Sequence, residues 1–441
     1  MLDILAHRTY RHLFAAQVIA LIGTGLATVA LGLLAFDLAG ENAGMVLGTA
    51  LAIKMIAYVG VAPVAAAFAE RLPRRTMLVT LDLVRAGVAL VLPFVSQIWE
   101  VYVLIFVLQA ASAAFTPTFQ ATIPDVLPQE KDYTKALSLS RLAYDMESLV
   151  SAMLAAALLT VISFHDLFAG TVVGFLASAA LVASVVLPAH PAPQRRGIYD
   201  RTTRGLRIYL ATPRLRGLLA VNAAVAAAGS MVFVNTMVIV QAGLGLTQSA
   251  VALALASFGA GSMVAALVLP RLLEKLTDRS VMLGGIGLMV AGLFAGTLVV
   301  GHASLMVLWF VLGLGYSTAQ TPSGRLLRRS SHPEDRPAMF AAQFALSHAC
   351  WLLFYPLAGW LGTRFGMTAT FVVLGCAGAV AVWVTTMVWS SQDPEVIEHK
   401  HPDLPAGHAH TQGAVATRDG VRHAHPFVVD DHHPNWPNLG G

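Results

Sequence analysis

Long apolar stretches separated by short polar segments make up most of the chain. Each stretch runs for about 20 residues or more with few charges, which is the length that an α-helix needs to cross the hydrocarbon core of a bilayer. This pattern differs from the alternation of apolar and polar positions that is typical of outer-membrane barrel strands. It therefore predicts an all-α membrane protein with twelve transmembrane helices, at about 12–36, 45–69, 76–96, 100–122, 136–162, 167–188, 214–241, 249–270, 280–300, 303–324, 338–362 and 368–390.

The longest polar segment between predicted helices, 189–213, separates two sets of six. The two sets resemble each other in sequence, because FVLQAASAAFTP at 106–117 is similar to FVLGLGYSTAQTP at 310–322. PQEKDYTKALSLS at 128–140 also matches PEDRPAMFAAQFA at 333–345 loosely. Paired halves are typical of alternating-access carriers, whose site lies between the repeats. We expect two pseudo-symmetric six-helix halves with a linker and a tail, at 1–188, 189–213, 214–391 and 392–441.

Basic residues are concentrated in one set of loops, whereas the opposite loops offer only Arg364. Because basic loops stay in the cytoplasm, we expect both termini, the linker and the tail to be cytoplasmic. MLDILAHRTYRH at the N-terminus has no features of a cleavable signal peptide. A cell membrane of the bacterial inner-membrane type is the expected location. The basic loops contain Arg71, Arg74, Arg75, Lys131, Arg195, Arg196, Arg201, Arg204, Arg207, Lys275, Arg279, Arg328, Arg329 and Arg336.

The composition agrees with a bilayer environment, since 56% of the residues are hydrophobic and 12% are charged. An average soluble domain has about 25% charged residues. Only two cysteines occur, Cys350 and Cys376, so neither a disulfide framework nor a thiolate metal cage is expected. No phosphate-binding G-x-x-x-x-G-K-[ST] loop is found, which argues against ATP hydrolysis. We expect a monomeric transporter with no enzymatic activity, no prosthetic group and no nucleic-acid partner.

The loop between the second and third predicted helices reads AFAERLPRRT, residues 67–76. Charges beside two helix ends can hold one conformation through ion pairs and helix dipoles, although a plain basic cytoplasmic loop is the alternative. With the twelve helices and the half repeat, this loop resembles the signature of the major facilitator superfamily, with Pro73 where that family has glycine. The resemblance implies the major facilitator fold and a conformational role for Glu70, Arg71, Arg74 and Arg75.

Two further segments narrow the resemblance. FTPTFQATIPDVLP at 115–128 and DLVRA at 82–86 are similar to exporters that include siderophore and macrolide efflux proteins. With its histidine-rich end, the whole chain resembles the nickel-resistance exporters of the superfamily, which implies Ni²⁺ or Co²⁺ as cargo. The glycine- and proline-rich motif of many antiporters is replaced by SLVSAMLAAALL at 149–160. Its small residues still permit close helix packing, but the family argument for proton antiport is weakened.

Four ionisable residues inside predicted helices are candidates for transport and proton coupling. Such groups are costly in a membrane and mark either a pathway or a partner in a neighbouring helix. Asp145 and Glu147 are two residues apart and point about 200° away from each other on a helix, so only one is expected to face a given site. Carboxylates and imidazoles bind divalent metals, and an acid that loses its metal can take up a proton. Lys54 and His348 complete the set, with helix-to-helix contacts as the alternative role.

Polar uncharged residues also lie on the first, fourth, seventh and tenth predicted helices, which line the pathway if the fold is as supposed. Each is either a cavity residue or an interhelical hydrogen-bonding group. These candidates are Gln17, Gln109, Asn222, Asn235, Tyr316 and Gln320.

The tail has almost no apolar run and is predicted to be disordered. It holds eight of the fifteen histidines, arranged as H-x-H pairs and a final HH. Binding by one imidazole raises the effective concentration of the next, and imidazole suits nickel, cobalt, zinc and copper(II). The predicted ligands are His399, His401, His408, His410, His423, His425, His432 and His433.

The sequence thus predicts secondary-active efflux of a divalent transition metal, nickel or cobalt, by proton antiport, with the tail collecting the metal. The alternative is efflux of a drug or siderophore by the same fold, with the tail as a metal sensor or buffer.

Overall fold

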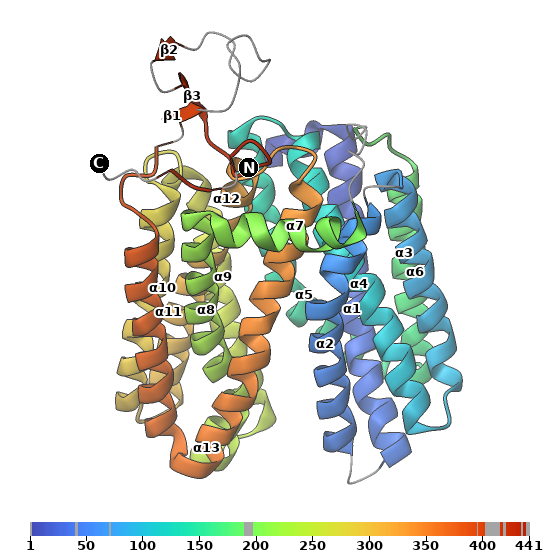
Figure 1. Ribbon diagram of the computed structural model, residues 1–441. Helices are drawn as coiled ribbons and strands as arrows, with labels where there is room; N and C mark the ends of the chain where they lie inside the picture. Colours follow the sequence, from blue (N-terminus) through green and yellow to red (C-terminus); the bar gives the residue numbers. More distant parts are fainter. Residues whose placement is uncertain are drawn as a thin grey trace.

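A computed structural model describes residues 2–39, 43–69, 72–188, 197–394, 396–401, 415–417, 420–433 and 435–437. Figure 1 shows two groups of long helices standing side by side. The first half contains α1 (Arg8–Ala39), α2 (Ala43–Ala69), α3 (Arg74–Val91), α4 (Ile98–Val126), α5 (Glu130–Leu158) and α6 (Phe164–Ala183). The second half contains α8 (Pro213–Met237), α9 (Gln248–Leu272), α10 (Asp278–Ala295), α11 (His302–Gln320), the short α12 (Ser323–Arg329) and α13 (Arg336–Val388).

Twelve membrane crossings follow from these helices. Among the described residues, ten helical segments are long and apolar enough to cross a bilayer. Helix α5 is an eleventh, because its 29 residues are long enough although charges interrupt its apolar run. The twelfth arises within α13, whose 53 residues turn at Gly366 with a φ of 81°, a conformation that glycine adopts without steric cost. The predicted twelve-helix fold in two halves is confirmed.

Each half has its own tightly packed interior. Helix α1 packs on α6 and α2 on α4 in the first half, while α8 packs on α13 and α9 on α11 in the second. Gly261 and Gly313 let α9 and α11 approach closely, because a Cβ at either position would collide with the facing backbone. Across the halves, α2 contacts α13 and α5 contacts α9. The two halves therefore meet along these helices.

One end of the bundle carries Leu2, the start of α13 at Arg336 and the described part of the tail (Figure 1). We call this end the terminal face. The linker predicted as a loop contains helix α7 (Ile198–Ala211), which lies across the terminal face and contacts both α2 and α13. Its buried residues recur at helical spacing, at Arg201, Arg204 and Ile208. An amphipathic helix is the conformation that places such residues on one face.

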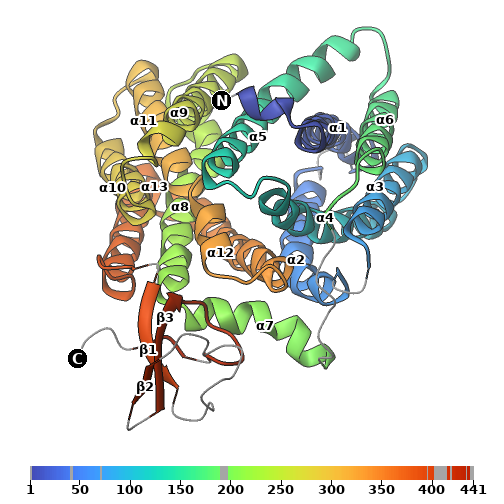
Figure 2. The same ribbon diagram turned by 90° about the horizontal axis from the view of Figure 1, so that it is seen from above.

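The tail also differs from its predicted disorder in the residues that the structure describes. Strands β1 (Val396–His401), β2 (Val415–Thr417) and β3 (Gly420–Pro426) form an antiparallel sheet in the order β1-β3-β2. Figure 2 shows this sheet beside α7, next to the second half. The reason is burial, because Ile397, Phe427 and Val429 join the hydrophobic core of the second half. Scattered apolar residues can thus anchor a segment that lacks an apolar run.

Candidate functional site

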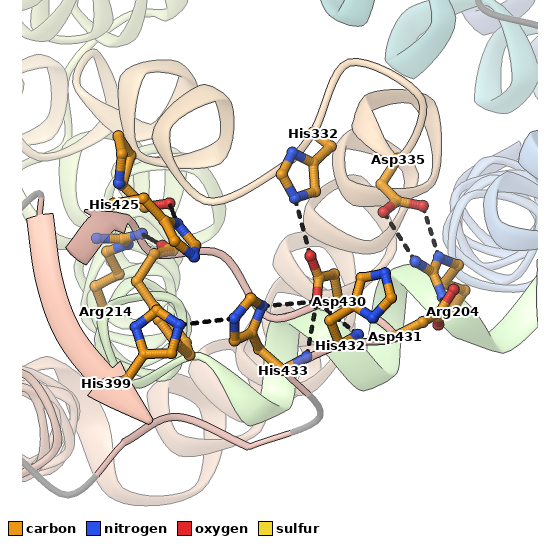
Figure 3. A network of polar contacts seen from close by, with 12 residues as sticks. Arg204, Arg214, His332, Asp335, His399, His425, Asp430, Asp431, His432 and His433 are labelled. Carbon is orange, nitrogen blue, oxygen red and sulfur yellow. Dashed lines mark hydrogen bonds and ion pairs between the residues drawn. The ribbon is translucent and has the colours of Figure 1, made fainter. Parts of the chain in front are cut away.

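Four tail histidines converge at the terminal face. His399 lies on β1, His423 and His425 lie on β3, and His433 lies on the turn after the sheet. One ring nitrogen of each lies within 4.8 Å of the others. The strand register pairs His399 with His423, and the period of two along a strand places His425 on the same face as His423. We call these residues the four-histidine cluster; Figure 3 shows three of them labelled.

The hydrogen bonds of the rings direct their lone pairs toward one another. The Nδ1 atoms of His399 and His425 lie 3.0 and 2.8 Å from the carbonyl oxygens of Ile397 and Pro426. His433 Nδ1 lies 2.9 Å from Asp430 Oδ1. Because these partners only accept, each Nδ1 is assigned the proton. In the neutral rings Nε2 therefore carries the lone pair, which is the arrangement of metal-binding histidines.

The separations between the Nε2 atoms fit a shared cation. His399 Nε2 lies 3.1 Å from His423 Nε2 and 2.9 Å from His433 Nε2 (Figure 3). Two nitrogens bound to one ion at the usual length of about 2.0–2.1 Å would be separated by a similar distance. One proton can bridge only one of these two contacts, whereas a divalent metal accepts all the lone pairs. The cluster can thus hold a borderline transition metal.

Asp430 connects the cluster to the body of the protein. Its Oδ1 accepts hydrogen bonds from His433 and from the backbone N–H of His432, and its Oδ2 lies 3.1 Å from Nε2 of His332. Burial opposes ionisation of Asp430, but the hydrogen bonds from His332 and His433 outweigh it and hold the pKa of Asp430 well below its ordinary value. The hydrogen bond to Asp430 raises the pKa of His332. The two residues therefore form a charge-assisted link between the tail and the segment before α13.

Two arginines hold the tail at the same place. Arg204 of α7 donates from Nε to Asp335 at 2.6 Å and from Nη1 to Asp431 at 2.7 Å (Figure 3). Arg214 of α8 donates to the carbonyl oxygen of Phe427 at 3.2 Å, and its guanidinium carbon lies 4.9 Å from the centre of the Trp436 ring. The cluster is thus positioned by contacts that come from α7, α8 and the start of α13.

Ion pairs join the two halves at the terminal face. Asp125 at the end of α4 pairs with Arg74 of its own half and with Arg336 of the other half. Lys131 lies 3.1 Å from Glu274 across the same boundary. Of the predicted loop charges, Arg74 is buried in this network, Arg75 is exposed, and Glu70 and Arg71 lie outside the described residues. Sequence reasoning did not single out Asp125, although the segment FTPTFQATIPDVLP at 115–128 contains it.

A central cavity of about 360 Å³ lies between the halves. Its lining includes four of the predicted candidates, Gln17, Tyr316, Gln320 and His348. Gln17 accepts a hydrogen bond of 3.0 Å from Ser140. The lining also includes Arg141, which sequence reasoning missed; its guanidinium carbon lies 4.8 Å from the centre of the Tyr316 ring. The sequence feature that could have identified Arg141 is its spacing from Asp145, because residues four apart lie on one helix face.

Asp145 and Glu147 face different neighbours, as their spacing requires. Asp145 pairs with Arg141 on α5 and accepts a hydrogen bond from Ser262 on α9 of the other half. Glu147 instead lies beside Gly25 of α1. Neither carboxylate is part of the described cavity lining.

The other intramembrane candidates contact residues of their own helix or of a neighbouring helix. Lys54 Nζ lies 5.5 Å from the centre of the Tyr58 ring, which in turn lies 4.7 Å from the ring of His348. Asn222 donates to the carbonyl oxygen of Leu218 at 2.9 Å, and Asn235 donates to that of Ala358 at 3.2 Å. Gln109 is half-buried on α4 and is not part of the described lining.

Of the other predicted tail ligands, His432 is not among the described residues that form the four-histidine cluster. His401 lies on β1 opposite Val421, and His432 is exposed. His408 and His410 lie outside the described residues.

Comparisons with known proteins agree with this architecture. The sequence profile of the Major Facilitator Superfamily matches residues 13–221 and 218–416. An uncharacterized MFS-type transporter, YfiS of Bacillus subtilis, is 22% identical over 377 residues, which cover 82% of this chain and 89% of that protein. Macrolide efflux protein A of Streptococcus pyogenes is 25% identical over 181 residues, covering 40% of this chain and 44% of that protein. The crystal structure of the human organic anion transporter MFSD10 (TETRAN) superposes with a TM-score of 0.74 at 10% identity, covering 86% of this chain and 99% of that one.

Proposed function

Because this chain belongs to the Major Facilitator Superfamily, and is a multi-pass membrane transporter rather than an enzyme, we propose that it exports a divalent transition metal. Nickel or cobalt is the proposed cargo, and protons are exchanged for it. The observation that carries the proposal is the convergence of four imidazoles within 4.8 Å of one another at the terminal face. A ligand set of imidazoles without thiolates favours Ni²⁺, Co²⁺, Zn²⁺ or Cu²⁺ over Cu⁺.

The proposed orientation places the terminal face in the cytoplasm of a bacterial-type cell. Arg74, Arg336 and Lys131 all lie at this face, together with the arginines of α7, and basic residues stay on the cytoplasmic side. The four-histidine cluster would then meet metal ions before they are exported. The tail would raise the local metal concentration beside the pathway in the way that a tethered second site does.

Proton coupling is assigned to Asp145 in this proposal. Its hydrogen bond with Ser262 crosses between the halves, so it must break when α5 and α9 separate during alternating access. Asp145 would then be able to bind a proton or contribute to a metal site with His348 of the cavity. The Arg141–Asp145 pair is neutral as a whole, which limits the repulsion that Arg141 alone would exert on a cation.

Metal flux in inverted membrane vesicles tests the proposal. With an imposed proton gradient, vesicles that contain the full chain should accumulate Ni²⁺ or Co²⁺, and dissipating the gradient should stop the uptake. Asp145→Asn and His348→Ala should each reduce uptake. Asp37→Asn, which alters an exposed acid on α1, is the matched control and should leave it unchanged. Vesicles without metal flux, or unchanged flux in both test variants, would contradict the proposal.

An organic cargo is the second candidate, because aromatic rings make up much of the cavity lining. The cavity of about 360 Å³ falls within the usual range of small-molecule sites, about 300–1,000 Å³. The similarity to a macrolide efflux protein over part of the chain also favours an organic cargo. Cells with and without the gene should be compared for sensitivity to metal salts and to macrolides. Protection against macrolides alone would favour the organic cargo. The rings concerned belong to Tyr58, Phe119, Tyr133, Tyr144, Tyr316, Phe340, Phe344 and Trp351.

A further inference from the structure

We infer that the four-histidine cluster is a metal-operated latch, which fixes the tail to the terminal face and favours the arrangement in which the two halves are joined there. The inference rests on the proposed function only in taking the ligand to be a divalent transition metal. It assigns to the tail a regulatory role that is separate from delivering metal to the cavity.

The first step is the repulsion between the rings. His399 Nε2 and His433 Nε2 are 2.9 Å apart, and the Nδ1 partners of both rings assign a lone pair to each of these atoms. A divalent ion converts this repulsion into two bonds. His433 is thereby tied to the sheet, since His399 lies on β1. The turn that carries Asp430 and Asp431 is held in place as a consequence.

The second step is the connection from the turn to the body of the protein. Asp430 lies 3.1 Å from His332, and Asp431 lies 2.7 Å from Arg204 of α7. Arg204 also binds Asp335. The tail therefore contacts His332 in the segment before α13, and it contacts α7, which itself touches both halves. Through Arg204 of α7 it is also linked to Asp335, the residue directly before α13.

The third step is the connection from α13 to the other half. Arg336 follows Asp335 directly and pairs with Asp125 of α4. Beside this pair, a cavity of about 340 Å³ is lined by Glu130 and Tyr133 of the first half and by Pro426 and Val428 of the tail. The docked tail and the first half thus share one boundary at the terminal face.

Thermodynamic linkage gives the direction of the effect. A ligand shifts a conformational equilibrium toward the state that it binds more tightly. The four histidines converge in the arrangement that has the tail docked and the halves joined at the terminal face. If the separated state lacks this convergence, a metal concentration of about 100 times its dissociation constant shifts the equilibrium about 100-fold. When the cytoplasm is rich in the ion, metal bound to the tail would then close the terminal face of the transporter.

Distances between spin labels on the full-length protein in lipid nanodiscs test the latch, with Cys350 and Cys376 replaced by serine. One label pair, Tyr199→Cys with Asn435→Cys, reports docking of the tail against α7. A second pair, Gln129→Cys with Lys275→Cys, reports closure between the halves. Zn²⁺ is the probe because it is diamagnetic. We expect Zn²⁺ to narrow the first distance distribution and to increase the short-distance population of the second pair.

Two carboxylate variants separate the latch from simple metal binding. Asp431→Asn keeps all four histidines and Asp430 but removes the charge that pairs with Arg204 of α7, so it should bind Zn²⁺ while its distances respond far less. Glu398→Gln is the matched control, because Glu398 is on the same sheet and pairs with Arg422 instead of the terminal face. It should respond like the parent protein.

The inference is overturned if Zn²⁺ does not bind, if Zn²⁺ binds without changing either distance, or if Asp431→Asn responds fully. None of these readouts requires transport. A protein that shows the latch response but no metal flux would therefore contradict the proposed cargo and not the latch.

Discussion

Replacing Asp125 with asparagine is expected to open the terminal face. Asp125 binds Arg74 of its own half and Arg336 of the other, and all three side chains are at most 14% exposed. Removing one partner costs about 3–5 kcal/mol in a fully buried pair, whereas exposed pairs contribute about 0–1 kcal/mol. Because this network is partly hydrated, we take the free-energy cost of losing the Asp125 charge to be about 2 kcal/mol, between these limits. Because each 1.4 kcal/mol is tenfold, the open population should rise about 30-fold.

Cysteine modification measures this shift. In a chain with Cys350→Ser and Cys376→Ser, Ser323→Cys places a thiol in the cavity lining near the terminal face. When opening is fast relative to modification, the rate with a membrane-impermeant maleimide follows the open population. Arg75→Gln is the matched control, because Arg75 is exposed beside the buried Arg74. A parent-like rate in Asp125→Asn, or an equal increase in the control, would refute the reasoning.

Three further outcomes are expected. His425→Ala should weaken Zn²⁺ binding by the full-length protein at least tenfold in equilibrium dialysis, while the exposed His432→Ala should bind like the parent; equal affinities would remove His425 from the cluster. Arg141→Gln should lower the rate of metal uptake in vesicles because it removes the guanidinium that pairs with Asp145, whereas Arg141→Lys should keep part of the rate; an unaffected Arg141→Gln would contradict a role for the pair. Gly366→Ala should destabilise the protein by about 1–3 kcal/mol, since the φ of 81° with a ψ of 172° lies in a region essentially restricted to glycine. The melting temperature in detergent should fall, and an unchanged melting temperature would contradict strain at this turn.

The membrane fold could be read from the sequence because bilayer physics acts on each segment separately. Apolar length alone identifies most crossings, and repeated motifs identify the halves. Helix α7 was missed because its buried face includes Arg201 and Arg204, which hydropathy counts as polar. Their burial becomes favourable only when acids from other segments meet them, as Asp335 and Asp431 do at Arg204.

The candidate site was predictable in residue type and less so in arrangement. The spacing of Asp145 and Glu147 correctly required two directions, but it did not say that Asp145 would meet Ser262 of the other half. Gln17, Tyr316, Gln320 and His348 line the cavity, whereas Asn222 and Asn235 bond to backbone carbonyl groups. Helical periodicity gives the direction of a side chain around its own helix, while the neighbour on that side depends on how twelve helices pack.

The sequence by itself determined that this chain spans a membrane, consists of two related halves and ends in a segment rich in imidazole. These properties depend on local composition and on repeats along the chain. Only the tertiary structure decided that His399, His423, His425 and His433 meet while His432 is exposed. The physical reason is that the meeting depends on the register of β1 with β3 and on the burial of Phe427 and Val429 in the second half. Contacts between distant segments form wherever burial favours them, and the spacing of the histidines along the chain does not specify where they will meet.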